Sequence, residues 1–236
     1  EERREGEAGL LAVLKELESA VAGLESHRDR LSPDISTGEF ESLMDLLTRV
    51  AVEGGRLRAY SYLWYAEDTQ EQTALAFRGH VDKLLTDVQN RTLFFTLWWK
   101  GLDDEPAARL LAAGGDNAYY LESLRRFKPH TLSEPEEKVI NVKDVNGVQG
   151  LVTVYEMITN AFAFEVEIDG QRQKLNRSEL MVYARDPRPE VREAIYRELY
   201  RVYSEQGTVL GQIYQYLVRD WASENLELRH FASPIA

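Results

Sequence analysis

The chain has 236 residues, of which 44% are hydrophobic and 29% are charged, enough to bury a core as one large or two small domains. Its formal net charge of −12 disfavours a broad basic surface for nucleic acid or anionic membrane. Cysteine is absent and no stretch approaches the roughly 18 apolar residues of a membrane helix, so we predict a cytoplasmic protein without disulfides or cysteine-ligated metals.

Apolar residues recur at three- and four-residue steps over residues 10–24 and again over 43–64, which predicts two amphipathic helices. Gly54 and Gly55 interrupt the second pattern and predict either a kink or a close contact with another helix. The strongest helical period runs from 69 to about 99 and predicts a helix of roughly 45 Å. We expect this helix to pair antiparallel with the preceding one as a long helical hairpin.

Shorter helices are predicted at 107–113 and 119–127. Ser133 and Glu136 have the spacing of a capping box, in which the Ser133 hydroxyl accepts a backbone N–H and the Glu136 carboxylate accepts the Ser133 amide. A helix is therefore predicted to begin there. A further helix is expected over 147–159, with its apolar side chains on one face.

Residues 162–168 depart clearly from the helical period. Large apolar residues alternate there with alanine or glutamate, and Asp169 and Gly170 follow. An Asp-Gly pair between extended segments is typical of a two-residue type I′ turn. We therefore predict a small β-hairpin at about 162–175. Its register places opposite charges across the two strands: Glu167 faces Arg172, and Glu165 faces Lys174.

Helices are expected again after this hairpin. Asn176 is placed to cap a helix with Glu179 at its third position. Residues 186–189 contain two prolines, which interrupt the helical pattern. The apolar spacing of residues 191–202 and 210–221 predicts two more amphipathic helices. The predicted fold class is all-α, mainly helical, with one long antiparallel helical hairpin and one small β-hairpin.

The four histidines are at positions 27, 80, 130 and 230, so the His-Glu-x-x-His motif of helical zinc peptidases is absent. Glu227 and His230 have the Glu-x-x-His spacing of di-iron bundles, but no other histidine has a Glu three residues before it. A ferritin-like metal bundle is therefore the weakest interpretation. Glycine-rich phosphate loops and the Gly-x-Ser-x-Gly motif are absent as well, and we predict no catalytic or metal-binding residue on this chain.

Aromatic residues concentrate in two stretches of the predicted helical hairpin: Tyr60, Tyr62, Trp64 and Tyr65, and Phe94, Phe95, Trp98 and Trp99. Packing of two long helices explains most of these rings as core residues. Tyr62, Tyr65 and Trp99 fall off the main apolar stripe. We therefore predict that these three are the first candidates for lining a ligand-binding groove.

Five segments together resemble one known family, the oligoendopeptidase F zinc peptidases. These segments are Tyr60–Thr69, Tyr120–Glu137, the hairpin Phe162–Leu175, Arg185–Ala194 and Leu226–Arg229. The similarity covers most of the chain from about residue 60, whereas residues 1–59 match only in helical character.

The resemblance implies a mainly helical peptidase of the thimet-oligopeptidase class, with two lobes around a deep channel that admits short peptides and excludes folded proteins. In that family the His-Glu-x-x-His motif lies in the C-terminal half, where its glutamate activates the zinc-bound water. This chain stops before that motif would be reached. We therefore expect residues 1–185 to form the N-terminal helical lobe, including the β-hairpin, and residues 186–236 to begin the catalytic domain.

The function that the resemblance implies is that of a channel wall and size filter in a peptide-bond hydrolase, with Tyr62, Tyr65 and Trp99 as substrate-channel candidates. Zinc is expected in the complete enzyme and not on this chain, which alone is predicted to be inactive. The expected partners are a C-terminal peptidase half, on the same or a separate chain, and short peptides, but neither nucleic acid nor membrane. An exposed apolar surface should remain where that half docks. The alternative is a non-enzymatic helical module that binds peptides or other proteins.

Overall fold

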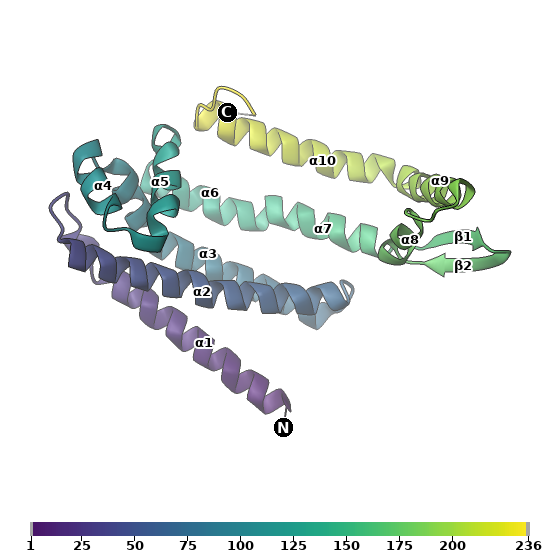
Figure 1. The fold of residues 1–236 in the computed structure, drawn as a ribbon, viewed down its shortest axis with the longest axis horizontal. Coiled ribbons are helices and arrows are strands. Elements are labelled where there is room, and N and C mark those ends of the chain that lie inside the picture. Colours follow the sequence, from purple (N-terminus) through teal and green to yellow (C-terminus); the bar gives the residue numbers. More distant parts are fainter. Residues whose placement is uncertain (1, 235–236) are drawn as a thin grey trace. The chain divides into compact units, whose positions relative to one another are not determined.

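The computed structural model describes residues 2–234, and the side chains of residues 9–234. Contacts divide the chain into two compact units: the first contains residues up to Val145 and those from Asn225 onward, and the second is Asn146–Glu224. Figure 1 shows the helices and strands in chain order. Among residues 2–234, no helix combines the length and the apolar character needed to cross a membrane.

This division groups residues 186–224 with the β-hairpin in the second unit. It does not test whether residues 1–185 are the N-terminal lobe of a larger enzyme and residues 186–236 the start of its catalytic domain. That assignment stays a prediction.

Three long helices form most of the first unit: α1 (Glu2–Glu25), α2 (Thr37–Glu67) and α3 (Gln72–Gly101). A short 3-10 helix, η1 (Arg28–Arg30), follows α1. Ser36 caps the start of α2, where its hydroxyl accepts a hydrogen bond from the Glu39 amide at 3.2 Å. The predicted antiparallel helical hairpin of α2 and α3 is confirmed, and α1 packs along α2 (Figure 1).

The glycine pair in α2 marks a close helix contact. A Cβ atom at Gly54 would lie 3.3 Å from Leu85 Cδ2 of α3, whereas one at Gly55 would meet nothing within 4 Å. Helix α2 continues without a break through both glycines. Of the two interpretations of the pair, the close contact is confirmed at Gly54.

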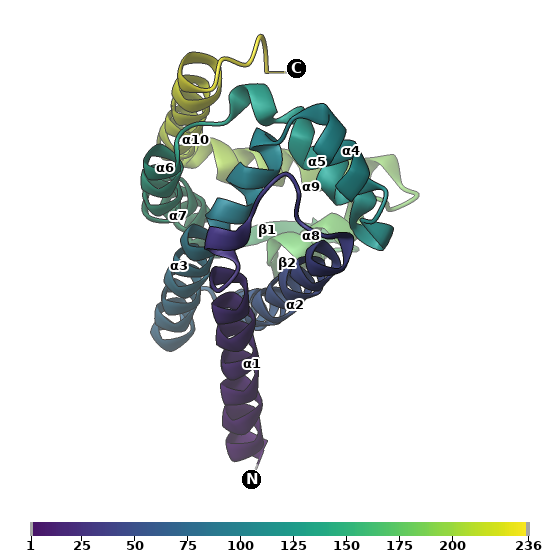
Figure 2. The ribbon, with the colours of Figure 1, turned by 90° about the vertical axis from the view of Figure 1, so that its left-hand side faces the viewer.

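The first unit continues through shorter helices. These are α4 (Asp104–Leu111), η2 (Gly115–Asn117), α5 (Ala118–Arg126), η3 (Lys128–His130) and α6 (Glu134–Asn146). Helices α4 and α5 lie beside each other at one end of this unit (Figure 2). The predicted helices near 107–113 and 119–127, and the helix start near Ser133, are confirmed.

The capping box at the start of α6 is half formed. The Ser133 amide donates to the Glu136 carboxylate at 2.9 Å, as predicted. The Ser133 hydroxyl, however, donates to the same carboxylate instead of accepting a backbone N–H. The prediction was wrong on this bond: the hydroxyl donates to a negatively charged acceptor, a charge-assisted hydrogen bond that is stronger than one between neutral groups.

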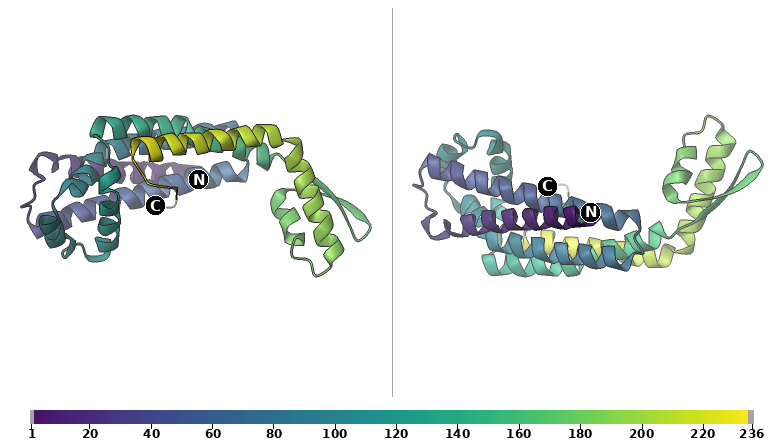
Figure 3. Two further views of the ribbon diagram at one scale, coloured as in Figure 1. Left: turned by 90° about the horizontal axis from the view of Figure 1, so that it is seen from above. Right: turned by 90° about the horizontal axis from the view of Figure 1, so that it is seen from below.

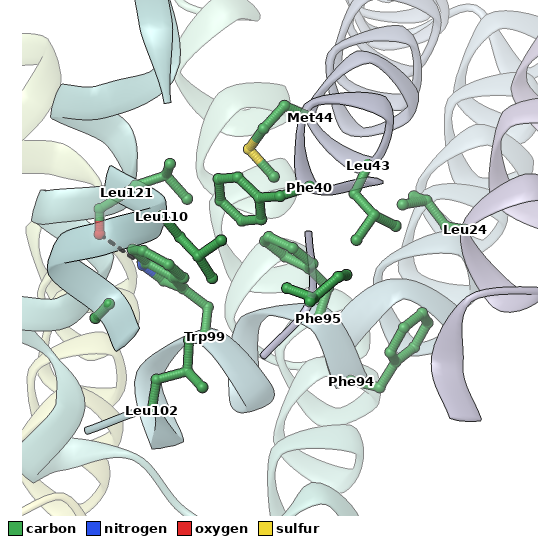
Figure 4. Close-up of a cluster of buried hydrophobic side chains, with 12 residues drawn as sticks. Leu24, Phe40, Leu43, Met44, Phe94, Phe95, Trp99, Leu102, Leu110 and Leu121 are labelled. Atoms are coloured by element: carbon green, nitrogen blue, oxygen red, sulfur yellow. Dashed lines mark hydrogen bonds between the residues drawn. The ribbon is translucent and has the colours of Figure 1, made fainter. Parts of the chain in front are cut away.

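The core of the first unit has two parts. One surrounds Trp99, Phe40 and Phe95 between α2, α3, α4 and α5, and the indole Nε1 of Trp99 donates to the Leu121 carbonyl at 2.8 Å (Figure 4). The other part joins α1, α2 and α3 through Leu17, Val21, Leu57, Val81, Leu85 and Val88. The buried indole thus ties α3 to α5 by both packing and a hydrogen bond.

The second unit combines helices with the β-hairpin. Its elements are α7 (Val148–Asn160), β1 (Phe164–Ile168), β2 (Gln171–Leu175), α8 (Arg177–Tyr183), α9 (Pro189–Glu205) and α10 (Gly207–Trp221); the π-helix η4 (Ala222–Leu228) follows. The strands lie beside α8 and α9 (Figure 3). The all-α fold class with one small β-hairpin is confirmed.

The hairpin has the predicted turn and register. Asp169 and Gly170 have φ values of 54° and 75°, as a type I′ turn requires. The Cα partners include Glu165 with Lys174 and Glu167 with Arg172. The side chains pair differently, because Arg172 reaches diagonally to Glu165 instead of Glu167.

One face of β1 forms the core of the second unit. Phe164, Val166 and Ile168 are buried against Leu180 of α8 and Ile195 of α9. The alternation of buried and exposed positions along β1 explains why a one-residue slip of the register would expose all three apolar side chains.

Candidate functional site

The three predicted groove residues do not meet in the structure. Tyr62 is 49% exposed, whereas the side chains of Tyr65 and Trp99 are buried. The Arg78 guanidinium lies 5.6 Å from the ring centre of Tyr62 and 4.4 Å from that of Tyr65. Trp99 is some 20 residues further along α3, about 30 Å away at the rise of an α-helix.

The aromatic residues of the helical hairpin form two separate groups. Tyr60, Trp64 and Phe77 contact one another near the turn between α2 and α3. Trp98 and Trp99 instead contact Phe40 at the far end of the pair. In an antiparallel pair of helices with its turn near residue 70, residue 64 lies opposite 77 and residue 40 lies opposite 99. The two aromatic stretches therefore cannot pack against each other.

A groove of about 930 Å³ lies within the first unit, between α2 and α3, with contributions from α5 and α6. Its apolar wall includes Met44, Leu47, Val50, Val88 and Leu93. Its polar and charged lining includes Arg58, Gln89, Thr92, Thr96, Lys100, Asn117, Tyr120, Glu137 and Asn141. Apolar walls with a few polar groups are typical of ligand-binding grooves.

Three side-chain amides join α3 to α6 beside this groove. The Asn141 Oδ1 atom accepts a hydrogen bond from Gln89 Nε2 at 2.9 Å. The Asn141 amide nitrogen in turn donates to Asn90 Oδ1 at 2.8 Å. These bonds fix the side chain of Asn141, and each amide keeps further donor or acceptor capacity for a ligand.

Glu137, at the start of α6, lines the groove and also holds the C-terminal segment. Both of its carboxylate oxygens accept hydrogen bonds from the Arg229 guanidinium at 2.8 Å, and one also accepts the Leu132 amide at 3.0 Å. The side chains of Glu137 and Arg229 are only 9% and 15% exposed. Burial alone would raise the pKa of Glu137, but these hydrogen bonds hold it below its usual value.

A second contact holds the same segment. The His130 Nδ1 atom lies 2.7 Å from the Arg229 carbonyl oxygen, and the His130 ring stacks on Phe231 with ring centres 3.8 Å apart. We call residues 229–231, bound to His130 and Glu137, the C-terminal latch. The latch fixes the Glu137 carboxylate at the edge of the groove.

Lys100, near the end of α3, is half-buried in the groove lining. Burial lowers the pKa of its ammonium, while the charge of Glu137 raises it and that of Arg229 lowers it. Within the part of the chain that the structure describes, the Lys100 ammonium has no hydrogen-bond or ion-pair partner. The groove therefore contains a cation whose charge is not matched by a bonded acid.

The histidines do not have the arrangement of a catalytic zinc site. His27 bonds the Gly23 carbonyl at 2.8 Å, His130 belongs to the latch, and His80 and His230 are exposed. None of the four belongs to a group of three converging histidine, aspartate or glutamate side chains among the described residues. Glu227 is exposed as well.

The comparisons with known proteins point to one family. Residues 98–164 match the family model described as oligopeptidase F. The crystal structure of oligoendopeptidase F from Enterococcus faecium aligns with 98% of this chain at a TM-score of 0.74 and 16% identity. The resemblance to oligoendopeptidase F is confirmed. The chain spans 44% of the enterococcal oligoendopeptidase F chain, and at this identity the alignment establishes the fold alone.

A second solved structure is less similar. It is a protein of Chlamydophila abortus, provisionally described as a peptidase, which aligns with 86% of this chain and 36% of its own length at 17% identity. Its TM-score of 0.46 is too low to support a conclusion. No curated protein matches the chain.

Sequence reasoning missed the groove and the latch. The segments of oligoendopeptidase F resemblance end at Glu137 and at Arg229, yet nothing in their spacing indicates that these two residues bond each other. A contact over such a sequence distance follows from the packing of whole helices.

Proposed function

We propose that this chain is the N-terminal portion of a zinc oligoendopeptidase that hydrolyses short peptides. It forms part of the channel wall and acts as a size filter, and a C-terminal half supplies the chemistry. The observation that supports this most is the alignment of 98% of the chain with 44% of the enterococcal oligoendopeptidase F. The match of residues 98–164 to the oligopeptidase F family model supports it independently.

The zinc of the complete enzyme is assigned to the C-terminal half, on the same or a separate chain. The arrangement of the four histidines supports this assignment, because none of them converges with two other potential ligands among the described residues. When bound there, zinc supplies an activated water for attack on the peptide bond. This chain contributes binding and selection of the peptide, and alone it is inactive.

Within this proposal, the groove of the first unit is part of the channel wall. Tyr62 remains a candidate for contact with a peptide because its ring is 49% exposed. Tyr65 and Trp99 are buried at 1% and 0% exposure, so their contribution is to hold α2, α3 and α5 in place. Tyr62 is not part of the groove lining, but an exposed tyrosine ring suits a peptide side chain, which has apolar and polar parts.

Exposed apolar side chains support docking of a further domain. In the second unit, the most exposed large residues on α9 and α10 are Tyr200 and Tyr214, at 65% and 68%. In the first unit, Val139 of α6 is 63% exposed. On α10, Val218 is exposed as well and lies one turn after Tyr214, and neighbouring exposed apolar residues of this kind are typical of surfaces that bind another protein.

The alternative is a non-enzymatic helical module that binds peptides. The location of the whole groove within the first unit favours it, since the groove needs no second half to exist. The two proposals share the peptide ligand and differ in whether hydrolysis follows. For both we propose a cytoplasmic location and no nucleic-acid or membrane partner, on the basis of the acidic, cysteine-free composition.

Denaturing intact-mass spectrometry of the protein purified from its own cells tests the proposal. We expect the 27.1 kDa sequence to occur with a second polypeptide, or within a longer one, that carries His-Glu-x-x-His. That material should hydrolyse a quenched fluorescent peptide, and a zinc chelator should stop it. A homogeneous 27.1 kDa species that binds peptides without hydrolysing them would favour the non-enzymatic module.

A further inference from the structure

The groove of the first unit has an unusual charge for this chain. The chain as a whole has a net charge of −12, but the charged groups that line the groove are Arg58, Lys100 and Glu137. Two of these three are cations. The one acid is already bonded to Arg229 through both carboxylate oxygens. The lining therefore has an excess of positive charge in an otherwise acidic protein.

The two cations lie apart along the groove: Arg58 of α2 is near its Leu85 end, and Lys100 is at the other end. Its side chain is half-buried near the C-terminus of α3, and its ammonium has no bonded partner within the described residues. This partly buried cation loses hydration, and the nearby charge of Glu137, which makes no bond to it, offsets only part of that loss. An anionic ligand group at this place would offset that loss and form a charge-assisted hydrogen bond.

The other lining groups suit a peptide. Met44, Leu47 and Val50 offer an apolar wall on α2, and the amides of Gln89 and Asn141 keep hydrogen-bonding capacity for a peptide backbone. We propose that this groove binds the C-terminal end of a short peptide, with its terminal carboxylate on Lys100 and its last apolar side chains against α2. This inference rests on the proposed function, because every short peptide that enters such a channel brings one free carboxylate.

The latch has a positioning role in this site. Because both oxygens of Glu137 are bonded to Arg229, that carboxylate acts on Lys100 through its charge alone and makes no hydrogen bond to the ammonium among the described residues. Replacing Arg229 would release Glu137 and let it compete with the peptide carboxylate for the ammonium. Arg229→Met should therefore weaken binding of a free-acid peptide more than binding of its amide.

The test compares two fluorescein-labelled peptides of alanine and leucine that differ only at the C-terminus, one a free acid and one an amide. Their dissociation constants for the 236-residue chain are measured by fluorescence anisotropy. We expect the acid to bind about tenfold more tightly than the amide, as one charge-assisted hydrogen bond to a half-buried cation implies. A third peptide, an amide with an internal glutamate, distinguishes a terminal carboxylate from an acidic side chain.

Variants locate the site. Lys100→Gln should remove the preference for the acid, Lys100→Arg should keep most of it, and Lys83→Gln, on an exposed part of α3 outside the groove, should leave it unchanged. Circular dichroism checks the helix content of each variant. If Lys100→Gln does not fold, the comparison of acid and amide on the unaltered chain still decides.

Equal affinities for the acid and the amide would overturn the carboxylate site, as would the failure of both peptides to bind. Equal binding of the terminal acid and the internal-glutamate amide would overturn the assignment to the C-terminus. A preference for the acid that survives Lys100→Gln in a folded variant would overturn the role of Lys100. The proposed peptidase fails separately, if the complete enzyme shows no chelator-sensitive hydrolysis.

Discussion

The aromatic core between α2, α3, α4 and α5 of the first unit buries Trp99 and Phe40 fully, whereas on α9 and α10 of the second unit Tyr200 and Tyr214 are 65% and 68% exposed. The first unit encloses a groove with a fixed polar lining. The second has a small apolar core on one face of β1, and most of the aromatic side chains of α9 and α10 lie outside it and are exposed. The proposed roles of the two units rest on this difference: the first offers a groove for a ligand, and the second offers an exposed surface for another domain.

The largest expected effect comes from the core of the first unit. Trp99→Ala should lower the free energy of unfolding by about 3–5 kcal/mol, because it leaves a cavity and removes the buried hydrogen bond to the Leu121 carbonyl. Tyr200→Ala in the second unit should change it by less than about 0.5 kcal/mol, as expected for an exposed side chain. Urea unfolding measures both. Comparable losses would mean that α9 is not the uncovered surface described here.

The latch should give the next largest effect. Arg229→Met leaves the Glu137 carboxylate buried without its partner and should cost about 2–4 kcal/mol. Arg126 forms an exposed pair with Glu122, so Arg126→Met is the matched control and should cost less than about 0.5 kcal/mol. Thermal unfolding followed by circular dichroism compares the two. An equal, small cost for both would show that the latch does not stabilise the first unit.

The pH dependence of the latch sharpens this result. The pKa of Glu137 is lowered from 4.5 in the folded chain, so its contribution to stability is fully present above about pH 4.5 and is lost as the pH falls through the lowered value. The cost of Arg229→Met should therefore shrink as the pH drops below about 4.5, since a protonated Glu137 no longer needs the guanidinium. Urea unfolding at several pH values measures it, and a cost independent of pH would contradict the assignment.

The smallest effects come from the helix caps, one in each unit. Asn176→Ala removes a complete capping box at the start of α8 and should cost about 1 kcal/mol. Ser36→Ala removes a single cap bond of 3.2 Å at the start of α2 and should cost somewhat less. Amide hydrogen exchange reports each loss locally. If the units open independently, exchange should rise in the second unit alone for the first variant and in the first unit alone for the other.

The sequence was sufficient wherever neighbouring residues decide the structure. The turn at Asp169 and Gly170 follows from the ease with which these residues adopt a positive φ. The strand register follows from the alternation of buried and exposed side chains. The cap at Asn176 and the antiparallel pair of α2 and α3 follow from spacing and from the helical period. Each of these signals lies within a few residues or along one helix.

The candidate site was predicted less well, because it depends on contacts between distant residues. Tyr65 and Trp99 were expected in a groove and are buried, while Lys100, next to Trp99, lines the groove instead. One position along a helix turns a side chain by about 100°, and only the packing of the other helices decides which side faces the core. The bond between Glu137 and Arg229 has no local signal at all.

The most direct test of the account is reconstitution. The 236-residue chain is combined with a polypeptide that carries the C-terminal half with His-Glu-x-x-His, and kcat/KM is measured on a quenched fluorescent peptide with and without a zinc chelator. We expect no hydrolysis by this chain alone and chelator-sensitive hydrolysis by the two together. Hydrolysis by this chain alone, or a stable complex of the two halves without peptidase activity, would contradict this expectation.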